Sequence, residues 1–176
     1  NIMNQIKNNY TFVLKSIKKH RQISPTLERL KNKTYIVSGG TRGIGFNIAK
    51  KLAMNGANVS IIGKTKEKHP KLQGTIFTSA EQINNAAKRY SCLGIPCDIR
   101  NEKHIRYAIN ETIDNFGSVD GVVLNASALC LNDTLNQTSK EVQLMSDVNI
   151  NGTYLFGQTC LKHMKNYKGH ILMIAP

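Results

Sequence analysis

Apolar residues occur along this chain in two alternating patterns. Short, nearly continuous apolar runs predict five β-strands, at residues 34–38, 58–62, 93–97, 119–125 and 170–174. Between them, apolar residues spaced three or four apart predict helices at 43–55, 79–90, 101–116 and 138–166. A regular alternation of strand and helix is typical of a parallel sheet covered by helices on both faces. We therefore predict an α/β fold of the Rossmann type, with a doubly wound parallel sheet.

The residues before the first strand follow a different pattern. Isoleucine and valine recur at helical spacing among lysines and predict a helix over 2–20. Residues 1–33 contain eight Lys or Arg residues but only one acidic residue. Such a basic, weakly amphipathic segment resembles a mitochondrial transit sequence, and a docking helix is the alternative. We expect a basic, helical extension over 1–32 and a dinucleotide-binding domain over 33–176.

Composition narrows the range of partners. The chain has 176 residues, a formal net charge of +13 and 40% hydrophobic residues, which suits one globular domain. It contains no apolar stretch long enough to span a bilayer, so we predict no integral membrane segment. The basic excess could attract nucleic acid, but the sequence contains no recognised nucleic-acid motif. The four cysteines lack the spacing of a zinc site, so we predict no metal.

A glycine-rich loop joins the first predicted strand to the first predicted helix. Gly39, Gly43 and Gly45 would let the backbone turn tightly and approach a pyrophosphate without an intruding side chain. The N-terminus of the following helix adds partial positive charge and free N–H groups. This strand–loop–helix context predicts a binding site for a dinucleotide phosphate.

The same loop identifies a family resemblance. Residues 38–45, SGGTRGIG, resemble the T-G-x-x-x-G-I-G signature of short-chain dehydrogenases/reductases, with serine at the usual threonine. Further marks follow in the family's order: CDI at 97–99, LNAS at 124–127, DVNING at 147–152 and GHILMI at 169–174. The long connection between the second strand and the next helix resembles that of one subgroup of the family. The resemblance implies the first five strands of the short-chain dehydrogenase fold.

The resemblance also implies roles for individual residues. Asp98 would lie near the adenine, and Asn149 would be the family's catalytic asparagine. The implied cofactor-binding residues are Ser38, Gly39, Thr41, Gly43, Ile44, Gly45, Asp98, Asn125, Ala126 and Ser127. The implied activity is hydride transfer between a nicotinamide cofactor and a small carbonyl or alcohol substrate.

Charge near the second strand indicates which cofactor to expect. NAD-selective sites carry an acidic residue at the end of this strand, where it holds the ribose hydroxyls. Here Lys64 stands at that place, and Arg42 adds a second positive charge from within the glycine loop. Both would favour a 2′-phosphate through charge-assisted hydrogen bonds. We therefore predict NADP rather than NAD, with Arg42 and Lys64 as further cofactor-binding residues.

The acid–base pair of the family is missing from the sequence. The family uses Tyr-x-x-x-Lys as its proton donor and acceptor, and none of the six tyrosines is followed by lysine at that spacing. Ala175 and Pro176 stand where the family's catalytic serine would fall. We expect the domain to be incomplete at its C-terminus, with the pair in a longer chain. The alternative is a catalytically degenerate subunit of a larger mitochondrial assembly.

Partners and location follow from these two readings. An active enzyme would take a small carbonyl or alcohol substrate, and either form would act as a homo-oligomer or as a subunit of a complex. The basic N-terminal segment favours a mitochondrial location, with peroxisomal and cytoplasmic locations as alternatives.

Overall fold

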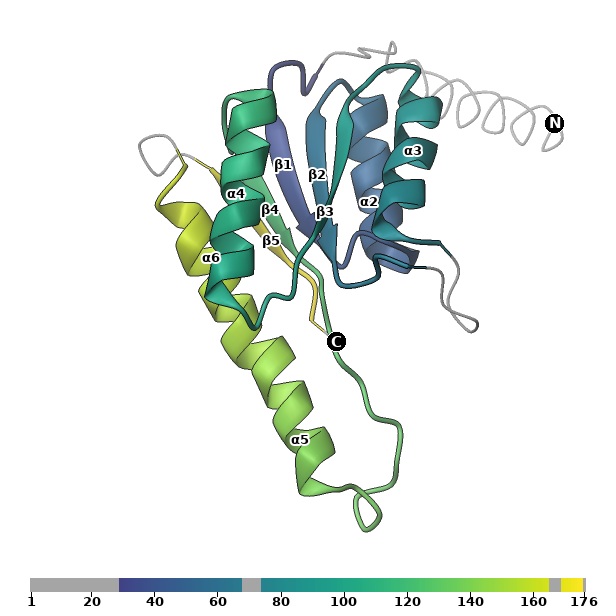
Figure 1. Cartoon of the computed structure of the whole chain (residues 1–176), viewed down its shortest axis with the longest axis vertical. Coiled ribbons are helices and arrows are strands. Elements are labelled where there is room, and N and C mark those ends of the chain that lie inside the picture. The colour runs from purple at the N-terminus through teal and green to yellow at the C-terminus, as the bar shows by residue number, and fades with distance from the viewer. Residues whose placement is uncertain (1–28, 68–73, 165–168, 176) are drawn as a thin grey trace, which may run out of the picture.

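The computed structural model describes residues 29–67, 74–164 and 169–175, so the predicted helix over 2–20 lies outside the described part. Strand and helix alternate through the described residues, as predicted (Figure 1). The strands are β1 Thr34–Ser38, β2 Asn58–Gly63, β3 Cys92–Pro96, β4 Gly121–Leu124 and β5 His170–Met173. The helical segments are α2 Gly43–Met54, α3 Ile76–Ala87, α4 Glu102–Phe116, α5 Ser139–Ser146, the π-helical η1 Asp147–Gly152 and α6 Thr153–Leu161.

All five strands pair in parallel, in the order β3-β2-β1-β4-β5. In the centre of the sheet, Ile36 of β1 is in register with Ser60 of β2 and Val122 of β4. The chain moves outward on one side of β1 and then crosses to β4 on the other side. The strand order therefore reverses between β1 and β4, and open α/β sheets bind their ligands at the carboxyl ends of such a pair.

Two buried clusters place helices on both faces of the sheet and confirm the doubly wound prediction. On one face, α4 and α6 bury Ile105, Ile109, Phe156 and Cys160 against the strands. On the other face, α2 and α3 contribute alanines and isoleucines to a second cluster. Figure 1 shows these two helix pairs on opposite sides of the strands.

The helix α2 buries a different face from the one expected. The apolar spacing indicated a face formed by Ile44, Ile48 and Leu52, but Ile44 is 62% exposed. The residues that α2 buries are small: Gly45, Ala49 and Ala53. Small side chains let the helix lie close to the sheet, while the larger aliphatic residues flank the contact.

The helix α3 starts three residues before the predicted position. Thr75 accepts a hydrogen bond from the backbone of Thr78, and the Thr78 hydroxyl accepts one in return from the backbone of Thr75. This reciprocal cap begins the helix at Ile76. At the other end Lys88 adopts a left-handed conformation with φ of 54°, which ends the helix before Tyr90. Helical spacing located α3 but not its cap, because a Thr–Thr pair is a weak sequence signal.

The stretch predicted as one helix over 138–166 is divided. The π-helical η1 separates α5 from α6, at the point where Gly152 packs against Ile99 with no room for a Cβ. None of the residues of α5 is buried. Figure 1 shows α5 projecting from the body of the domain beside the loop that follows β4. Among the described residues, no helix combines the length and apolarity that a membrane crossing requires.

A carboxylate ties the amino ends of the central strands together. Asp120 accepts hydrogen bonds from the Lys33 ammonium at 2.8 Å, the Thr34 N–H at 3.0 Å and the Ser118 hydroxyl at 3.0 Å. Burial by itself would raise the pKa of Asp120, but these three donors outweigh it and lower the pKa below its ordinary value of 3.8. The charged form of Asp120 therefore stabilises the folded chain.

We expect Asp120→Ala to lower the free energy of unfolding near neutral pH by about 1–3 kcal/mol, because a buried N–H loses its acceptor. The folded-state pKa is the lower one, so this contribution is present above about pH 4 and lost as the pH falls further. The difference between variant and parent should then shrink in acid. Urea denaturation at several pH values measures it, with the exposed Glu81→Gln as control. A difference independent of pH would contradict this account.

Candidate functional site

The site begins with a network that joins the carboxyl ends of β1 and β4. The Ser38 hydroxyl, at the end of β1, accepts from the N–H groups of Asn125 and Ala126 at 3.0 Å each and donates to the Val123 carbonyl at 3.2 Å. The Asn125 amide donates to the carbonyls of Ser38 at 2.9 Å and Gly39 at 3.3 Å. We call these contacts the Ser38–Asn125 network. It fixes the glycine loop to the neighbouring strand.

The glycine loop provides a cradle without side chains. Gly39 and Gly43 have positive φ values of 66° and 60°. A Cβ on Gly45 would lie 2.5 Å from both the Asn125 amide nitrogen and the Gly39 carbonyl oxygen, so only glycine fits there. At Gly43, by contrast, a Cβ would meet nothing within 4 Å and would point into open space. The loop is packed tightly against the protein on one side and left open on the other.

The N-terminus of α2 is available to an anion. Its N-cap residue, Arg42, has extended backbone and makes no side-chain capping hydrogen bond, and the first turn contains no acidic residue. Free N–H groups and the helix dipole at such a terminus favour a phosphate. The loop and the helix terminus therefore fit the pyrophosphate of a dinucleotide.

A cavity of about 240 Å³ opens beside this loop. Its walls come from the carboxyl ends of β1, β2, β3 and β4 and from the helical segments α5 and η1. The lining residues are Gly39, Thr41, Arg42, Ile62, Gly63, Lys64, Thr65, Cys97, Asp98, Ile99, Ala126, Ser127, Ala128, Leu144 and Val148. Segments far apart in the sequence meet here because parallel strands all end at the same edge.

Most of the residues predicted from the sequence meet in or beside this cavity. Those that line it are Gly39, Thr41, Arg42, Lys64, Asp98, Ala126 and Ser127. The others lie around the glycine loop. Ser38, Gly45 and Asn125 form its support, and the Ser38 hydroxyl already uses its one donor and two acceptor positions. Gly43 and Ile44 are exposed at the start of α2.

Several lining residues were not predicted as site residues. Ile99, Leu144 and Val148 form an apolar wall, and they come from the loop after β3, from α5 and from η1. Apolar side chains in helices and strands are ordinarily core residues, so nothing in their spacing separated them from the core. Cys97 also lines the cavity, and burial raises the pKa of its thiol to about 12, so the thiol stays protonated.

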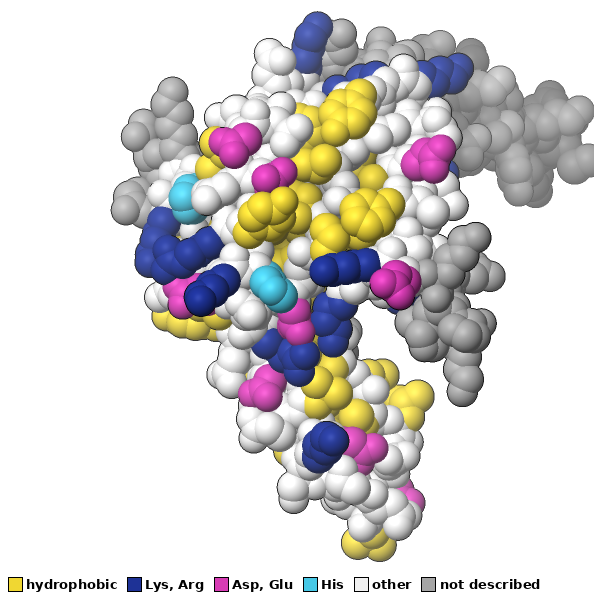
Figure 2. Space-filling view, in the orientation of Figure 1, with side chains coloured by type: hydrophobic (Ala, Val, Ile, Leu, Met, Phe, Trp, Pro, Cys, Tyr) yellow, Lys and Arg dark blue, Asp and Glu magenta, His cyan; other side chains and the backbone are white. Residues whose placement is uncertain are grey.

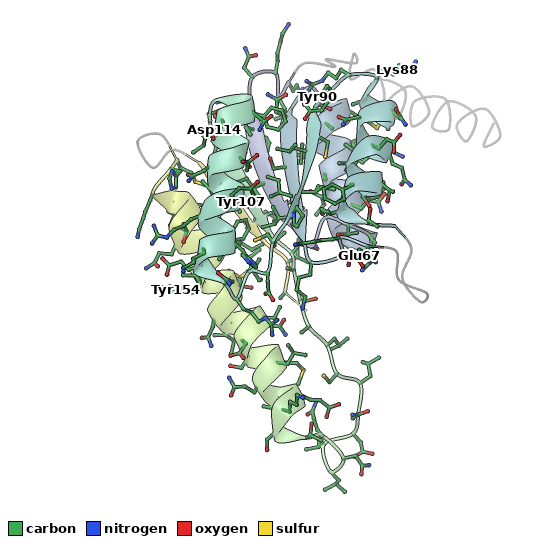
Figure 3. All side chains as sticks on the ribbon, viewed as in Figure 1. Glu67, Lys88, Tyr90, Tyr107, Asp114 and Tyr154 are labelled. Atoms are coloured by element: carbon green, nitrogen blue, oxygen red, sulfur yellow. The ribbon has the colours of Figure 1, made fainter. Side chains whose placement is uncertain are left out.

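Positive charge lies at the β2 end of the cavity. Arg42 reaches across to the Thr65 hydroxyl at 3.4 Å, and Lys64 is exposed on the same connection. The nearest acidic residue along the chain, Glu67, projects from this connection and is not among the lining residues (Figure 3). In Figure 2, basic side chains gather across the middle of the molecule, near the ends of the strands. Arg42 and Lys64 therefore line the same end of the cavity, and their binding to a cofactor stays a prediction.

An ion pair closes the β3 end of the cavity. Asp98 follows β3, and the Arg100 guanidinium engages both of its carboxylate oxygens, with Nε 3.0 Å from Oδ1 and 3.1 Å from Oδ2. A second guanidinium nitrogen lies 2.6 Å from Oδ2. The hydrogen bond from Arg100 is the main cause that lowers the pKa of Asp98 to about 2. Asp98 is therefore an acceptor only, at any pH near neutrality.

Asn149 lies in η1 next to the lining residue Val148 and is not itself among the lining residues. Its side-chain oxygen accepts from the Ala128 N–H at 2.8 Å, and its amide nitrogen donates to the Ala128 carbonyl at 2.9 Å. The side chain thus holds the loop that follows β4 in place. The catalytic role of Asn149 stays a prediction.

The described tyrosines lie away from the cavity. Tyr90 lies at the opposite end of the sheet, while Tyr107 and Tyr154 project from α4 and α6 (Figure 3). None of the described tyrosines lines the cavity. Ala175, at the position of the family's serine, is exposed just after β5. The cavity therefore has the features of a cofactor site, while the described residues provide no tyrosine for proton transfer.

Fold and site together define an α/β protein with a dinucleotide-type cleft at the topological switch point of its sheet. Comparison with known proteins gives the family: the model of the family described as short chain dehydrogenase matches residues 33–175. The chain belongs to the short-chain dehydrogenase family, whose fold binds a nicotinamide cofactor.

The relatives extend the comparison. Hydroxysteroid dehydrogenase-like protein 2 of Mus musculus is 43% identical over 155 residues, which are 86% of this chain and 31% of the relative. The chain thus spans about a third of the length of this curated relative. A short chain dehydrogenase of Mycobacterium thermoresistibile superposes with a TM-score of 0.77 at 42% identity, over 84% of this chain and 52% of that one. A Burkholderia cenocepacia short chain dehydrogenase, solved in complex with NADP, has a TM-score of 0.70 at 26% identity, over 83% and 56%.

The Ser38–Asn125 network gives a test of the site's support. We expect Ser38→Ala to lower the free energy of unfolding by about 2–3 kcal/mol, since two backbone N–H groups lose their acceptor. Ser38→Thr keeps the hydroxyl and introduces the residue usual in the family at this position, so its loss should be smaller than that of Ser38→Ala. Chemical denaturation of both variants measures the difference. Equal losses in the two variants would show that the hydroxyl is not what holds the loop.

Proposed function

We propose that this chain is the cofactor-binding part of an NADP-dependent short-chain dehydrogenase/reductase. The observation that carries the proposal is the positive charge of Arg42 and Lys64 at the end of β2, since Asp98, the acidic residue of the cavity lining, follows β3 instead and is paired with Arg100. A 2′-phosphate placed there would meet two cations, whereas ribose hydroxyls would find no carboxylate. The NADP complex of the Burkholderia cenocepacia relative supports the choice by analogy.

Each part of the cavity has a separate task in this proposal. The glycine loop and the start of α2 would hold the pyrophosphate through backbone N–H groups. Asp98 and the apolar residues Ile99 and Val148 would hold the adenine. Ala126 and Ser127, at the end of β4, would face the middle of the dinucleotide. When bound, the nicotinamide supplies hydride exchange with a carbonyl or alcohol carbon.

The substrate class is proposed only as a small carbonyl or alcohol compound. Hydride transfer also needs a proton donor and acceptor beside the carbonyl, and the sequence lacks the Tyr-x-x-x-Lys pair throughout its 176 residues. Asn149 is positioned by Ala128 at the cavity wall and is the remaining candidate for a catalytic part.

One observation favours a second candidate function, a catalytically degenerate subunit. Ala175 stands where the family's serine would fall, and alanine can neither donate nor accept a hydrogen bond through its side chain. In that case the fold would serve a larger assembly. The basic N-terminal segment leads us to propose mitochondria as its location in either case.

We also infer that the domain associates with another copy or with a larger complex. Ile150 and Tyr154 are 65% and 68% exposed on η1 and α6, and the apolar residues of β5 are exposed as well. Exposed apolar side chains that lie four residues apart on one helical face, as Ile150 and Tyr154 do, mark interaction surfaces.

The cofactor proposal is tested by equilibrium binding to the full chain. We expect NADPH to bind more tightly than NADH, and Lys64→Asp to raise the Kd of NADPH about tenfold or more, because a charge-assisted hydrogen bond is replaced by repulsion. The same variant should bind NADH at least as well as the parent, since a carboxylate can hold ribose hydroxyls.

The matched control for this experiment is Lys66→Asp. It makes the same charge change two residues further along the exposed connection, outside the cavity lining. It should leave the ratio of the two Kd values nearly unchanged. A parent chain that binds NADH as tightly as NADPH would overturn the proposed cofactor preference.

We expect this chain to bind NADPH without oxidising it at the rate of a complete enzyme. We expect residues 1–176 to bind NADPH but to oxidise it with carbonyl substrates at least about a hundredfold more slowly than a relative that has the Tyr-x-x-x-Lys pair, since general acid–base catalysis contributes at least that factor. The absorbance of the reduced nicotinamide follows the reaction, with a family member that carries the Tyr-x-x-x-Lys pair as reference. Turnover at a comparable rate would exclude the degenerate subunit.

A further inference from the structure

The ion pair at the β3 end of the cavity engages both oxygens of the Asp98 carboxylate. Arg100 gives Asp98 four contacts: two from Nε, one from a terminal guanidinium nitrogen and one from its own backbone N–H at 3.1 Å. The two Nε contacts share one hydrogen, so three N–H groups occupy three of about four lone-pair positions and one position remains for a cofactor group. The two side chains are only partly exposed, at 37% for Arg100 and 21% for Asp98. The bidentate fork is therefore a defined and directional contact.

A third charge lies close to this pair. Lys64 lines the same cavity as Asp98, and its positive charge further lowers the pKa of the Asp98 carboxyl. In the described part of the chain, Lys64 makes no hydrogen bond or ion pair with Asp98 or with any other residue. Lys64 therefore interacts with the carboxylate through its charge and makes no hydrogen bond to it. Both carboxylate oxygens are held by Arg100.

A second carboxylate, that of Asp147, lies near Arg100. Together with Asp98, Asp147 and Asn151, Arg100 lines a second hollow, between the loop after β3 and η1. The Asp147 carboxylate acts on the Arg100 guanidinium, and Asp147 is held in turn by Gln143 at 2.8 Å. Two nearby carboxylates attract the Arg100 guanidinium, whereas Arg42 and Lys64 repel it, so it favours its present position over the cationic end of the cavity.

Removing Arg100 would change the charge balance of the cavity. The Asp98 carboxylate would keep its place on the loop after β3 but lose its partner. Lys64 has a long, flexible and exposed side chain and is the cation of the cavity lining that already interacts with this carboxylate. It would turn toward Asp98, and the positive charge at the β2 end would be partly cancelled.

We propose that Arg100 is a positioning residue for cofactor selection: by holding Asp98 in a bidentate pair, it leaves Lys64 directed at the 2′-phosphate of NADP. This inference rests on the proposed NADP preference and gives that preference a second determinant, outside the phosphate site itself. Arg100 needs no contact with the phosphate to have this effect.

The test uses two probes that differ by one phosphate group, adenosine 2′,5′-bisphosphate and 5′-AMP. Isothermal titration calorimetry of the full chain gives the ratio of their affinities, in which any shared change at the adenine cancels. We expect Arg100→Gln to lower this ratio about threefold to fivefold, the range of charge pairs near solvent. Arg100→Gln combined with Asp98→Asn should restore the ratio to within about twofold of the parent, because the competing carboxylate is gone.

The double variant separates this effect from a structural one. If Arg100 only stabilised the fold, removal of Asp98 would not restore the preference for the 2′-phosphate. Arg106→Gln is the matched control, because Arg106 forms an exposed ion pair with Glu102 on α4 and its loss changes the net charge equally. It should leave the ratio unchanged. Arg100→Lys keeps the charge without the fork and should lie between the parent and Arg100→Gln, and thermal unfolding checks that every variant is folded.

The outcomes distinguish the two proposals. A parent chain that favours the bisphosphate, with Arg100→Gln equal to the parent, overturns the role of Arg100 and leaves the NADP proposal standing. A lowered ratio that the double variant does not restore also overturns it. A parent chain that binds both probes equally overturns the NADP preference and this inference with it.

Discussion

The hydrogen bonds between Ser38 and the residues after β4 are the constraint on which the site depends. They join the two strands at the point where the strand order reverses, so that the glycine loop and the β4 end stay at a fixed separation. Gly45 can then lie against Asn125 and the Gly39 carbonyl, which brings the N-terminus of α2 to the rim of the cavity. The buried alanine face of α2 serves the same close approach. Loss of the Ser38 hydroxyl would therefore affect loop, helix and cavity together.

Electrostatics divides the cavity into two ends with different tasks. Arg42 and Lys64 provide net positive charge at the β2 end, while Asp98 and Arg100 form a locally neutral pair at the β3 end. A carboxylate beside two cations would ordinarily weaken a site for an anionic cofactor. The bidentate pair keeps the Asp98 carboxylate in the cavity as a hydrogen-bond acceptor while its charge is balanced by a guanidinium that is also near Asp147.

The architecture and much of the site could be predicted from the sequence because both depend on local patterns. Apolar periodicity gave the alternation of strands and helices, and glycine spacing located the phosphate cradle. Those patterns missed α3's start, since the Thr75–Thr78 cap depends on two hydroxyls rather than on apolar spacing. They also missed the apolar wall around Val148, because a cavity residue and a core residue look alike in one dimension. The Asp98–Arg100 pair was missed for a similar reason: two residues of opposite charge in a loop are usually solvated separately.

The π-helical η1 packs against the loops that carry site residues, so its conformation affects the site. Gly152 lies against Ile99 with no space for a Cβ, and Ile99 follows Asp98 on the loop after β3. An extra residue in the helical turn lets the chain pass this contact and still present Asn149 to both backbone groups of Ala128. The loops after β3 and β4 are thus both braced by the same six-residue segment. Since α5 itself buries none of its residues, this bracing depends on η1 and α6 rather than on the projecting helix.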